Sequence, residues 1–507
     1  MRIALIPLDE RPVNLQLPRQ VAMIAGHELV TPPERLLPHF REAGDADALA
    51  DWLEQVAVDC DAFVVCLDTL AFGGLIAART SDDVLSAVIA RIDVLDRVAA
   101  MHPRLRIYAV SLVMRASDSY SSTEEPDYWS DYGRDLHRLG ADLHRLLEFA
   151  AEGAETGSAG APSAIPADVR SDFERRRLRN HVVNLAGMSL VAAGTIEYLA
   201  ITADDTAPLS AGSAEQLWLG HWLRALPLAE DRAQMYPGAD EVGAQLVARA
   251  LTASAGTPRW HVVCPEPGGL DRIANFENVP LSTSVLRQIH AAGGVVVDSA
   301  EPADITLVVH AADPGRGDRF GGGTVSDPDA VERVVDAVRD ALARGAVVAL
   351  ADLRFSNGAD PLLMERLAAA GILLRLAAYG GWNTAGNALG GAVASASAYW
   401  AGLRAGALDP HAVRIALLTR LLDDWVFQSE IRPRLQATVF QGSIAPVPPE
   451  VCAQASRLIE AELGGRLREI APSSGVRVGS VGLPWSRSFE IAVELVPAGT
   501  SGAAGER

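Results

Sequence analysis

Two adjacent carboxylates, Asp204 and Asp205, follow the short apolar run at residues 198–203. Neighbouring carboxylates can be given different environments, because hydrogen bonds hold one of them ionised while burial raises the pKa of the other. Such a pair can orient a substrate and act as general acid and base. We therefore predict that Asp204 and Asp205 are catalytic. Two alternatives stay open at this point: a divalent-metal site that combines them with Asp9 and Asp68, or a plain turn.

Further polar side chains directly follow most of the other apolar runs of the chain. In parallel α/β folds ligands bind beyond the carboxyl ends of the strands, so these side chains are candidates for a binding site. For each single aspartate, helix N-capping is the alternative explanation. The predicted substrate-binding residues are Asp9, Glu10, Arg11, Asp68, Arg115, Asp352, Asn357, Asp360, Trp382, Asn383 and Asn387.

The chemical types in this set favour a ligand that is rich in hydroxyl groups. The three asparagines offer neutral donors and acceptors, and Trp382 offers an apolar platform, which together suit a sugar. A buried structural network is the alternative. Arg11 and Arg115 could bind an acidic group of the substrate or only neutralise the neighbouring carboxylates.

Short apolar or β-branched runs alternate with segments of helical pattern through most of the chain. Near-continuous apolar strands between helices indicate a parallel sheet that is covered on both faces, and the count of eight predicts a (β/α)8 barrel. Two doubly wound α/β domains are the alternative, because extra strand-like runs occur at 28–30 and 295–298. The eight runs lie at 3–8, 63–67, 106–113, 198–203, 260–264, 304–310, 346–351 and 373–378.

The length of 507 residues exceeds the usual ceiling of about 250–300 residues for one hydrophobic core, so we expect a second unit. We assign residues 1–404 to a catalytic domain, with a flexible insertion near 151–168 that is rich in Ala, Gly, Ser and Pro. Residues 405–507 are expected to form a C-terminal cap of helices and strands. The strand-like runs of this cap lie at 476–482 and 489–496.

Composition excludes several classes of function. The net charge of −20 argues against a nucleic-acid or anionic-membrane partner. All 44 basic residues are arginine, so Schiff-base, pyridoxal-phosphate and Walker-type chemistry, which need a lysine amine, are excluded. No run approaches about 18 apolar residues, so no membrane span is expected. We expect a cytoplasmic protein without a cofactor that acts on a small molecule, and a homo-oligomer stays possible.

Seven motifs together resemble a bacterial family of unknown function, the domain family numbered 4127, over essentially the whole chain. The resemblance is specific for the family but implies no activity. The motifs are IPLDERPVN at 6–14, LDTLAFGGLIAAR at 67–79, DDT at 204–206, PGADEVG at 237–243, NGAD at 357–360, GWNTAGN at 381–387 and PWSRSFE at 484–490.

A second and weaker resemblance is to the barrel N-acetylglucosaminidases of the O-GlcNAcase and hyaluronidase type, which place an Asp-Asp pair after the fourth barrel strand. It implies that Asp204 orients the acetamido group of the substrate and that Asp205 is the general acid and base. The usual Gly-Phe-Tyr-Gly segment of the first strand is replaced here by Asp9, Glu10 and Arg11. The substrate therefore need not be an N-acetylhexosamine.

These observations predict a glycoside hydrolase-like enzyme that acts on a small sugar or glycoside. A divalent-metal-dependent hydrolase or isomerase built on the aspartate cluster is the first alternative. A sugar-binding protein without turnover is the second.

Overall fold

The computed structural model describes residues 1–151, 165–226, 228, 231–301, 303–313 and 325–499. Most of the flexible insertion predicted near 151–168 lies outside these residues. The described chain is a mixed α/β protein with parallel sheets, which confirms the predicted class. Among the helices described, none is long and apolar enough to cross a membrane.

Six parallel strands form the first sheet, in the order β2-β1-β3-β4-β5-β6. The direction in which strands are added reverses between β1 and β3. In open α/β sheets, ligands bind beyond the carboxyl ends of the strands next to such a reversal. The strands are β1 (Arg2–Ile6), β2 (Glu28–Val30), β3 (Ala62–Cys66), β4 (Arg106–Val113), β5 (Tyr198–Ala203) and β6 (Ala233–Pro237).

Five parallel strands form the second sheet, in the order β11-β10-β9-β7-β8. Taken in chain order this is the arrangement 2-1-3-4-5, which the first five strands of the first sheet also adopt. The order is that of the doubly wound alternative, while closure of the strands into one (β/α)8 barrel stays a prediction. The strands are β7 (Arg259–Val263), β8 (Val295–Val297), β9 (Ile305–His310), β10 (Val347–Asp352) and β11 (Ala378–Gly380).

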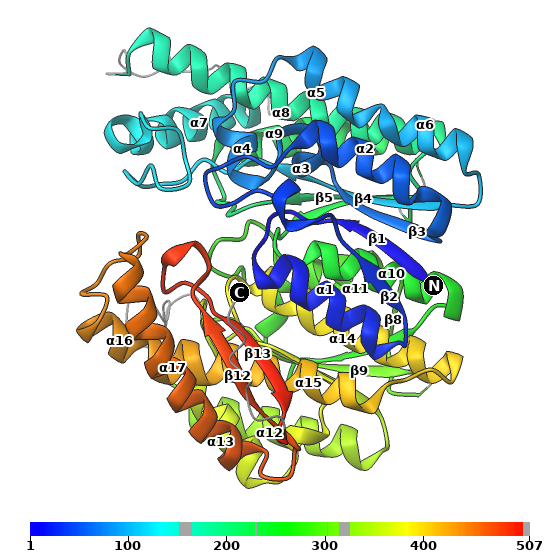
Figure 1. Cartoon of the computed structure of the whole chain (residues 1–507), viewed down its shortest axis with the longest axis vertical. Helices are drawn as coiled ribbons and strands as arrows, with labels where there is room; N and C mark the ends of the chain where they lie inside the picture. The colour runs from blue at the N-terminus through cyan, green and yellow to red at the C-terminus, as the bar shows by residue number, and fades with distance from the viewer. Residues whose placement is uncertain (152–164, 227, 229–230, 302, 314–324, 500–507) are drawn as a thin grey trace.

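The helices lie in layers on both sides of each sheet (Figure 1). One layer, α2 to α9, covers the outer face of the first sheet, and α1, α10, α11 and α14 lie between the two sheets. These helices are α1 (Pro12–Ile24), α2 (Ala46–Val56), α3 (Leu67–Phe72), α4 (Leu75–Thr80), α5 (Leu85–Ile92), α6 (Val94–Met101), α7 (Trp129–Ala151), α8 (Ala167–Ala193), α9 (Ala211–Ala225), α10 (Val242–Ala255), α11 (Leu281–Ala291), α12 (Pro328–Ala343), α13 (Pro361–Ala369) and α14 (Ala385–Ala405).

The middle layer of helices shares one hydrophobic core with both sheets. Along β1, Ile3 packs into this shared core and Ala4 packs into the core under the outer helices. Along β9, Leu307 packs into the shared core and Val308 into the core against α12 and α13. Successive side chains of a strand point to opposite faces, so strands covered on both sides need apolar residues at every position. This explains why the strands are continuous apolar runs.

The C-terminal residues pack against the outer core of the second sheet and return to its carboxyl edge. A π-helix, η6 (Leu421–Ile431), interrupts the helical segment 410–438, and the predicted strand-like runs near 476–482 and 489–496 form an antiparallel pair. The elements are α15 (Pro410–Arg420), η6, α16 (Arg432–Thr438), α17 (Pro449–Ile470), β12 (Val476–Gly482) and β13 (Ala492–Pro497).

The structure differs from the predicted strands at two places. First, β6 was not predicted, because its sequence Ala-Gln-Met-Tyr-Pro has no long apolar run; it is a strand that pairs with β5. The run at 373–378 instead begins with a 3-10 turn at Leu373–Arg375 and only Ala378 belongs to β11. Leu374 is exposed there, so the run does not have the two buried faces of a central strand.

Candidate functional site

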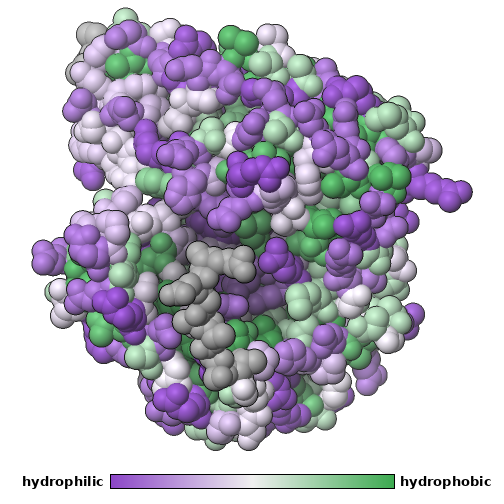
Figure 2. Space-filling model, viewed as in Figure 1, coloured by the Kyte–Doolittle hydropathy of each residue, from purple (hydrophilic) through white to green (hydrophobic). Residues whose placement is uncertain are grey.

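A cavity of about 520 Å³ lies beyond the carboxyl ends of strands from both sheets. Arg11 follows β1, Asp205 follows β5 and Asp240 follows β6, whereas Asn357 follows β10 and Asn383 follows β11. The volume is in the range of small-molecule sites. On the face shown in Figure 2, hydrophilic residues gather where the surface is hollowed between the upper and the lower half.

The turn after β5 places two carboxylates of different character at the cavity wall. Asp204 forms an ion pair with Arg79, and 13% of its side-chain surface is exposed. Asp205 accepts a hydrogen bond from Arg115 Nη1 at 2.8 Å, and 37% of its side chain is exposed. Loss of water around the carboxyl, together with the charge of Asp204, raises the pKa of Asp205 to about 6. Asp205 can thus gain or lose a proton near neutral pH.

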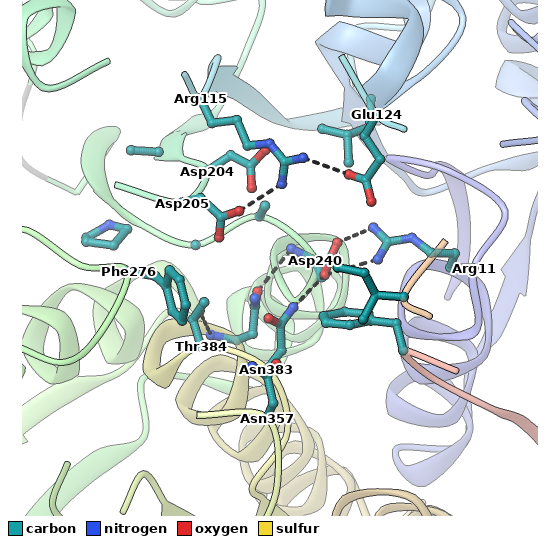
Figure 3. Close-up of a pocket in the computed structure, with 18 of the residues that line it drawn as sticks. Arg11, Arg115, Glu124, Asp204, Asp205, Asp240, Phe276, Asn357, Asn383 and Thr384 are labelled. Atoms are coloured by element: carbon teal, nitrogen blue, oxygen red, sulfur yellow. Dashed lines mark hydrogen bonds and ion pairs between the residues drawn. The ribbon is translucent and has the colours of Figure 1, made fainter. Parts of the chain in front are cut away.

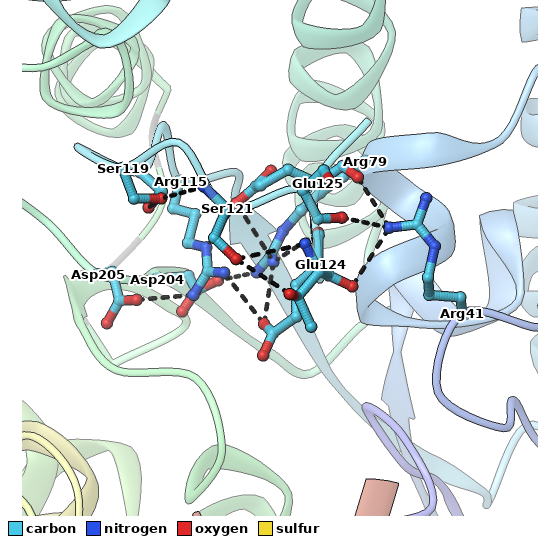
Figure 4. Close-up of polar contacts among 12 residues, drawn as sticks. Arg41, Arg79, Arg115, Ser119, Ser121, Glu124, Glu125, Asp204 and Asp205 are labelled. Atoms are coloured by element: carbon cyan, nitrogen blue, oxygen red, sulfur yellow. Dashed lines mark hydrogen bonds and ion pairs between the residues drawn. The ribbon is translucent and has the colours of Figure 1, made fainter. Parts of the chain in front are cut away.

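The loop between β4 and α7 carries Glu124, which binds three arginines from different parts of the chain. Figure 4 shows two of them, Arg79 and Arg115. Its Oε2 accepts hydrogen bonds from Arg115 Nη2 at 3.0 Å and from Arg79 Nη1 at 3.5 Å, and it also pairs with Arg487. Burial opposes the charged form, but these guanidinium groups, Arg115 foremost, hold the pKa of Glu124 well below its usual range. Behind it, Glu125 accepts a bond from Arg115 Nε at 2.8 Å.

Asp240 lies at the base of the cavity, where groups from both halves of the chain meet (Figure 3). Arg11 pairs with it, and Asn383 Nδ2 donates to its Oδ2 at 2.9 Å. Asn387 Oδ1 accepts a hydrogen bond from the backbone N–H of Asp240 at 3.1 Å. Burial raises the pKa of Asp240, and the Arg11 guanidinium opposes that shift. Because Arg11 and Asn383 donate to both carboxylate oxygens, Asp240 is fixed in one orientation.

The wall opposite Asp205 consists of amide and aromatic side chains. In Figure 3, Asn357 and Asn383 lie across the cavity from Asp204 and Asp205. The cavity is also lined by Phe276 and Phe489, and the exposed ring surface of Phe276 can stack on an apolar face of a ligand. The asparagines are those predicted to bind a hydroxyl-rich ligand, but Trp382, predicted as the apolar platform, is buried and does not line the cavity. Phe276 and Phe489, which the sequence did not identify, supply the aromatic surface instead.

The backbone around the cavity adopts an uncommon conformation at four lining residues. The φ values are 39°, 65°, 60° and 68° for Asp205, Phe276, Asn357 and Asn383. These values lie in the left-handed region, which residues other than glycine rarely adopt. Such residues cost about 1–3 kcal/mol each and gather at ligand and active sites, where surrounding contacts hold them in place. Their position supports a functional role for this cavity.

Seven of the thirteen predicted site residues line the cavity. They come from five separate segments of the chain, which the fold brings together. These seven are Arg11, Arg115, Asp204, Asp205, Asn357, Asn383 and Asn387.

Three predicted residues that follow β1 and β3 lie behind the cavity wall. Asp9 accepts hydrogen bonds from Arg11 Nη2 at 2.7 Å and from Asn14 Nδ2 at 2.8 Å, so it positions Arg11. Glu10 accepts a bond from Trp485 Nε1 at 2.6 Å. Asp68 accepts a bond from the Leu112 N–H at 2.8 Å, and burial raises its pKa to about 7. These three side chains support the site rather than line it.

The other three belong to buried networks near the second sheet. Asp360 caps α13 and contacts His310 Nε2 at 3.2 Å, and Asp352 Oδ2 accepts a bond from the Asp360 N–H at 2.8 Å. Burial alone would lower the pKa of His310, but hydrogen bonds to Asp360 and Glu266 raise it to about 9. Trp382 is buried with its ring against Phe489 at a centroid distance of 5.4 Å.

The structure does not assemble the metal site that was considered as an alternative. Asp9 is bound to Arg11, Asp68 to a backbone N–H and Asp204 to Arg79, so their oxygens face separate partners. In the part of the chain that is described, no group of three or more His, Cys, Asp or Glu residues has the geometry to hold a metal ion.

Several lining residues were missed because they do not directly follow a recognised strand. Asp240 was missed because β6 was not recognised as a strand, although its place shortly after β6 is the same signal that identified Asp204. Arg79 lies in α4, Glu124 in a loop, and Arg487 between the last two strands, where strand-end reasoning gives no signal. The missed lining residues are Leu75, Arg79, Glu124, Ala203, Pro237, Gly238, Ala239, Asp240, Phe276, Thr384, Ile444, Arg487, Ser488 and Phe489.

The fold and the cavity define an α/β protein with a small-molecule-sized cavity beyond the carboxyl ends of two parallel sheets. The family model described as protein of unknown function (DUF4127) matches residues 3–494. The chain belongs to this family, as its motifs predicted. No curated protein and no solved structure matches the chain.

Proposed function

We propose that the chain is a glycoside hydrolase-like enzyme that acts on a small sugar or glycoside, with Asp205 as its proton-transferring group. The observation that carries this proposal is that the Asp205 side chain is more exposed to the cavity than those of the other lining carboxylates, Asp204, Asp240 and Glu124. Asp205 is 37% exposed and has a raised pKa of about 6, whereas Asp240 is only 7% exposed and is bound by Arg11. A reachable general acid near a second carboxylate that is held by hydrogen bonds is the arrangement that glycosidases use.

The surroundings of Asp205 support a sugar as the ligand. Asn357 and Asn383 offer neutral hydrogen-bonding groups across the cavity, and Phe276 offers an aromatic face. In this proposal Asp204, fixed by Arg79, orients the substrate next to the acid. The site does not depend on a closed barrel, since two facing sheet edges supply the same residues.

A cytoplasmic location belongs to the same proposal. The cysteines Cys60, Cys66, Cys264 and Cys452 are all free thiols, which suits a reducing compartment.

The test is hydrolysis of a panel of aryl glycosides, including N-acetylglucosaminide and N-acetylgalactosaminide, with and without EDTA. The variants are Asp205→Asn and, as a matched control, Asp118→Asn, whose side chain is 68% exposed and lies outside the cavity. We expect turnover that survives EDTA, is kept by Asp118→Asn, and falls by about 10²-fold or more in Asp205→Asn.

Other outcomes lead to the alternatives. Turnover that EDTA abolishes would move the activity to the metal-dependent class. Sugar affinity without any product, in both the wild type and Asp205→Asn, would indicate a binding protein. Equal turnover of Asp205→Asn and the control would refute the role of Asp205.

A further inference from the structure

The arginines that line the cavity are all committed to carboxylates of the protein. Arg11 pairs with Asp9 and Asp240, and contacts Glu490 at 3.6 Å. Arg79 pairs with Asp204, and its Nη1 is 3.5 Å from Glu124. An anionic ligand would therefore have to compete with these internal partners.

The other two arginines of the cavity wall, Arg115 and Arg487, are also paired with carboxylates of the protein. Arg115 binds Glu124, Glu125 and Asp205 at 3.0, 2.8 and 2.8 Å. Arg487 pairs with Glu124 and stacks over Trp485 with its Cζ 4.4 Å from the ring centroid. Both guanidinium groups are thus held on several sides.

In the described part of the chain, the arginines of the cavity wall have more carboxylate partners than the wall itself supplies. Four arginines and four carboxylates line the cavity, and three further carboxylates contact these arginines from directly behind the wall, which makes seven. The seven are Asp9, Asp204, Asp205, Asp240, Glu124, Glu125 and Glu490.

Among these carboxylates, Glu124 contacts Arg79, Arg115 and Arg487 together, and its side chain lies in the cavity wall. Removing its charge would leave these guanidinium groups with less compensation, at a place that a ligand can reach. The attraction of an anion to such a group is strong in a partly buried site.

We infer that Glu124 is a specificity-determining residue, which neutralises three arginines of the cavity wall and so restricts the site to uncharged sugars. Uronides and sugar phosphates are excluded. This inference narrows the substrate class of the proposed function. That the ligand is a sugar rests on the proposed function, whereas the exclusion of anions rests on the ion pairs alone. It also decides between the two roles considered for Arg115, in favour of neutralising carboxylates.

The first experiment compares matched neutral and anionic ligands. Binding of phenyl glucoside and phenyl glucuronide, and of the galactose pair, is measured by isothermal titration for the wild type, Glu124→Gln and Glu430→Gln. Glu430 is the control, because it holds Arg466 through two hydrogen bonds of 3.0 Å but does not line the cavity. We expect Glu124→Gln to gain at least about tenfold in affinity for the uronide, with the neutral ligand within about twofold.

The second experiment does not depend on a sugar. Inorganic phosphate is titrated at constant ionic strength and pH 7.5 while the unfolding temperature is recorded. We expect phosphate to stabilise Glu124→Gln at about tenfold lower concentration than the wild type or Glu430→Gln. If Glu124→Gln does not fold, Glu125→Gln, which also frees Arg115, replaces it with the same expected direction.

The outcomes separate this inference from the proposed function. A wild type that binds the uronide as tightly as the glycoside, or a Glu124→Gln variant with unchanged phosphate affinity, would overturn the role of Glu124. If no sugar binds but phosphate behaves as expected, the sugar proposal fails while the exclusion of anions stands.

Discussion

Replacing Glu277 with Gln should stabilise the protein at alkaline pH by removing a buried charge. Glu277 is almost fully buried, and its carboxylate accepts hydrogen bonds from Ser284 Oγ at 3.0 Å and from the Gly386 N–H at the start of α14. Burial raises its pKa from 4.5 to about 7. A glutamine has the same shape, its oxygen can accept from Gly386, and its NH₂ group can donate to the Ser284 hydroxyl.

The size of the effect follows from proton linkage. Since the pKa is higher in the folded state, the carboxyl stabilises the fold below pH 4.5, and this stability is lost as the pH rises through about 7. One pH unit corresponds to 1.36 kcal/mol, so the loss between pH 5 and pH 8 is about 2.5 kcal/mol for this group. Glu277→Gln should lack this contribution. Relative to the wild type, it should therefore be more stable at pH 8 than at pH 5 by about that amount.

The measurement is denaturant unfolding of both proteins at pH 5 and pH 8, with the midpoint and slope fitted together. Glu365→Gln is the control, because Glu365 is exposed on α13. A difference between Glu277→Gln and the wild type that does not change between the two pH values would refute the reasoning. The same result in the control would show that the effect is not specific to the buried group.

Three further predictions concern the cavity and its support. Arg79→Met should destabilise the fold by roughly 3–5 kcal/mol in denaturant unfolding, because three carboxylates lose their cation, whereas an unchanged midpoint would contradict the ion pairs as described. Trp382→Ala should cost roughly 3–5 kcal/mol and weaken ligand binding in a calorimetric titration, since the ring supports Phe489; unaltered affinity would argue against this support. The proposed activity should fall as the pH rises through about 6, because Asp205 loses its proton, and Arg115→Met should move this limb of the kcat/KM profile to higher pH; a shift to lower pH would be inconsistent with the pairing.

The strand ends could be predicted because each depends on local sequence. The run at 198–203 coincides with β5, so Asp204 and Asp205 were assigned to a strand end from their neighbours alone. Asn357 and Asn383 follow neighbouring strands of the second sheet, so their closeness to each other also followed from the rule that parallel strands end at the same edge. Their approach to Asp205, which follows a strand of the first sheet, depends on how the two sheets pack and did not follow from that rule.

The ion pairs of the cavity could not be predicted, because they join segments that are distant in the chain. Arg487 reaches Glu124 across 363 positions, and Arg11 reaches Asp240 across 229. The sequence left two roles open for Arg115, binding an acidic group of the substrate or neutralising carboxylates of the protein. Only the structure shows that its guanidinium group already has carboxylate partners, Glu124 among them. The burial of Asp352 and Asp360 beside His310 likewise depends on packing around the second sheet, which the residue types do not reveal.

The most direct test of the central claim, that Asp205 transfers a proton to a glycosidic oxygen, is the dependence of the Asp205→Asn effect on the leaving group. Using the sugar that the glycoside panel identifies, kcat/KM is measured for a 2,4-dinitrophenyl glycoside and for the methyl glycoside. The dinitrophenolate leaves without protonation, whereas methanol needs a proton. The account predicts a loss of about 10²-fold or more for the methyl glycoside and a much smaller loss for the dinitrophenyl glycoside. Equal losses for both substrates, or none for either, would contradict it.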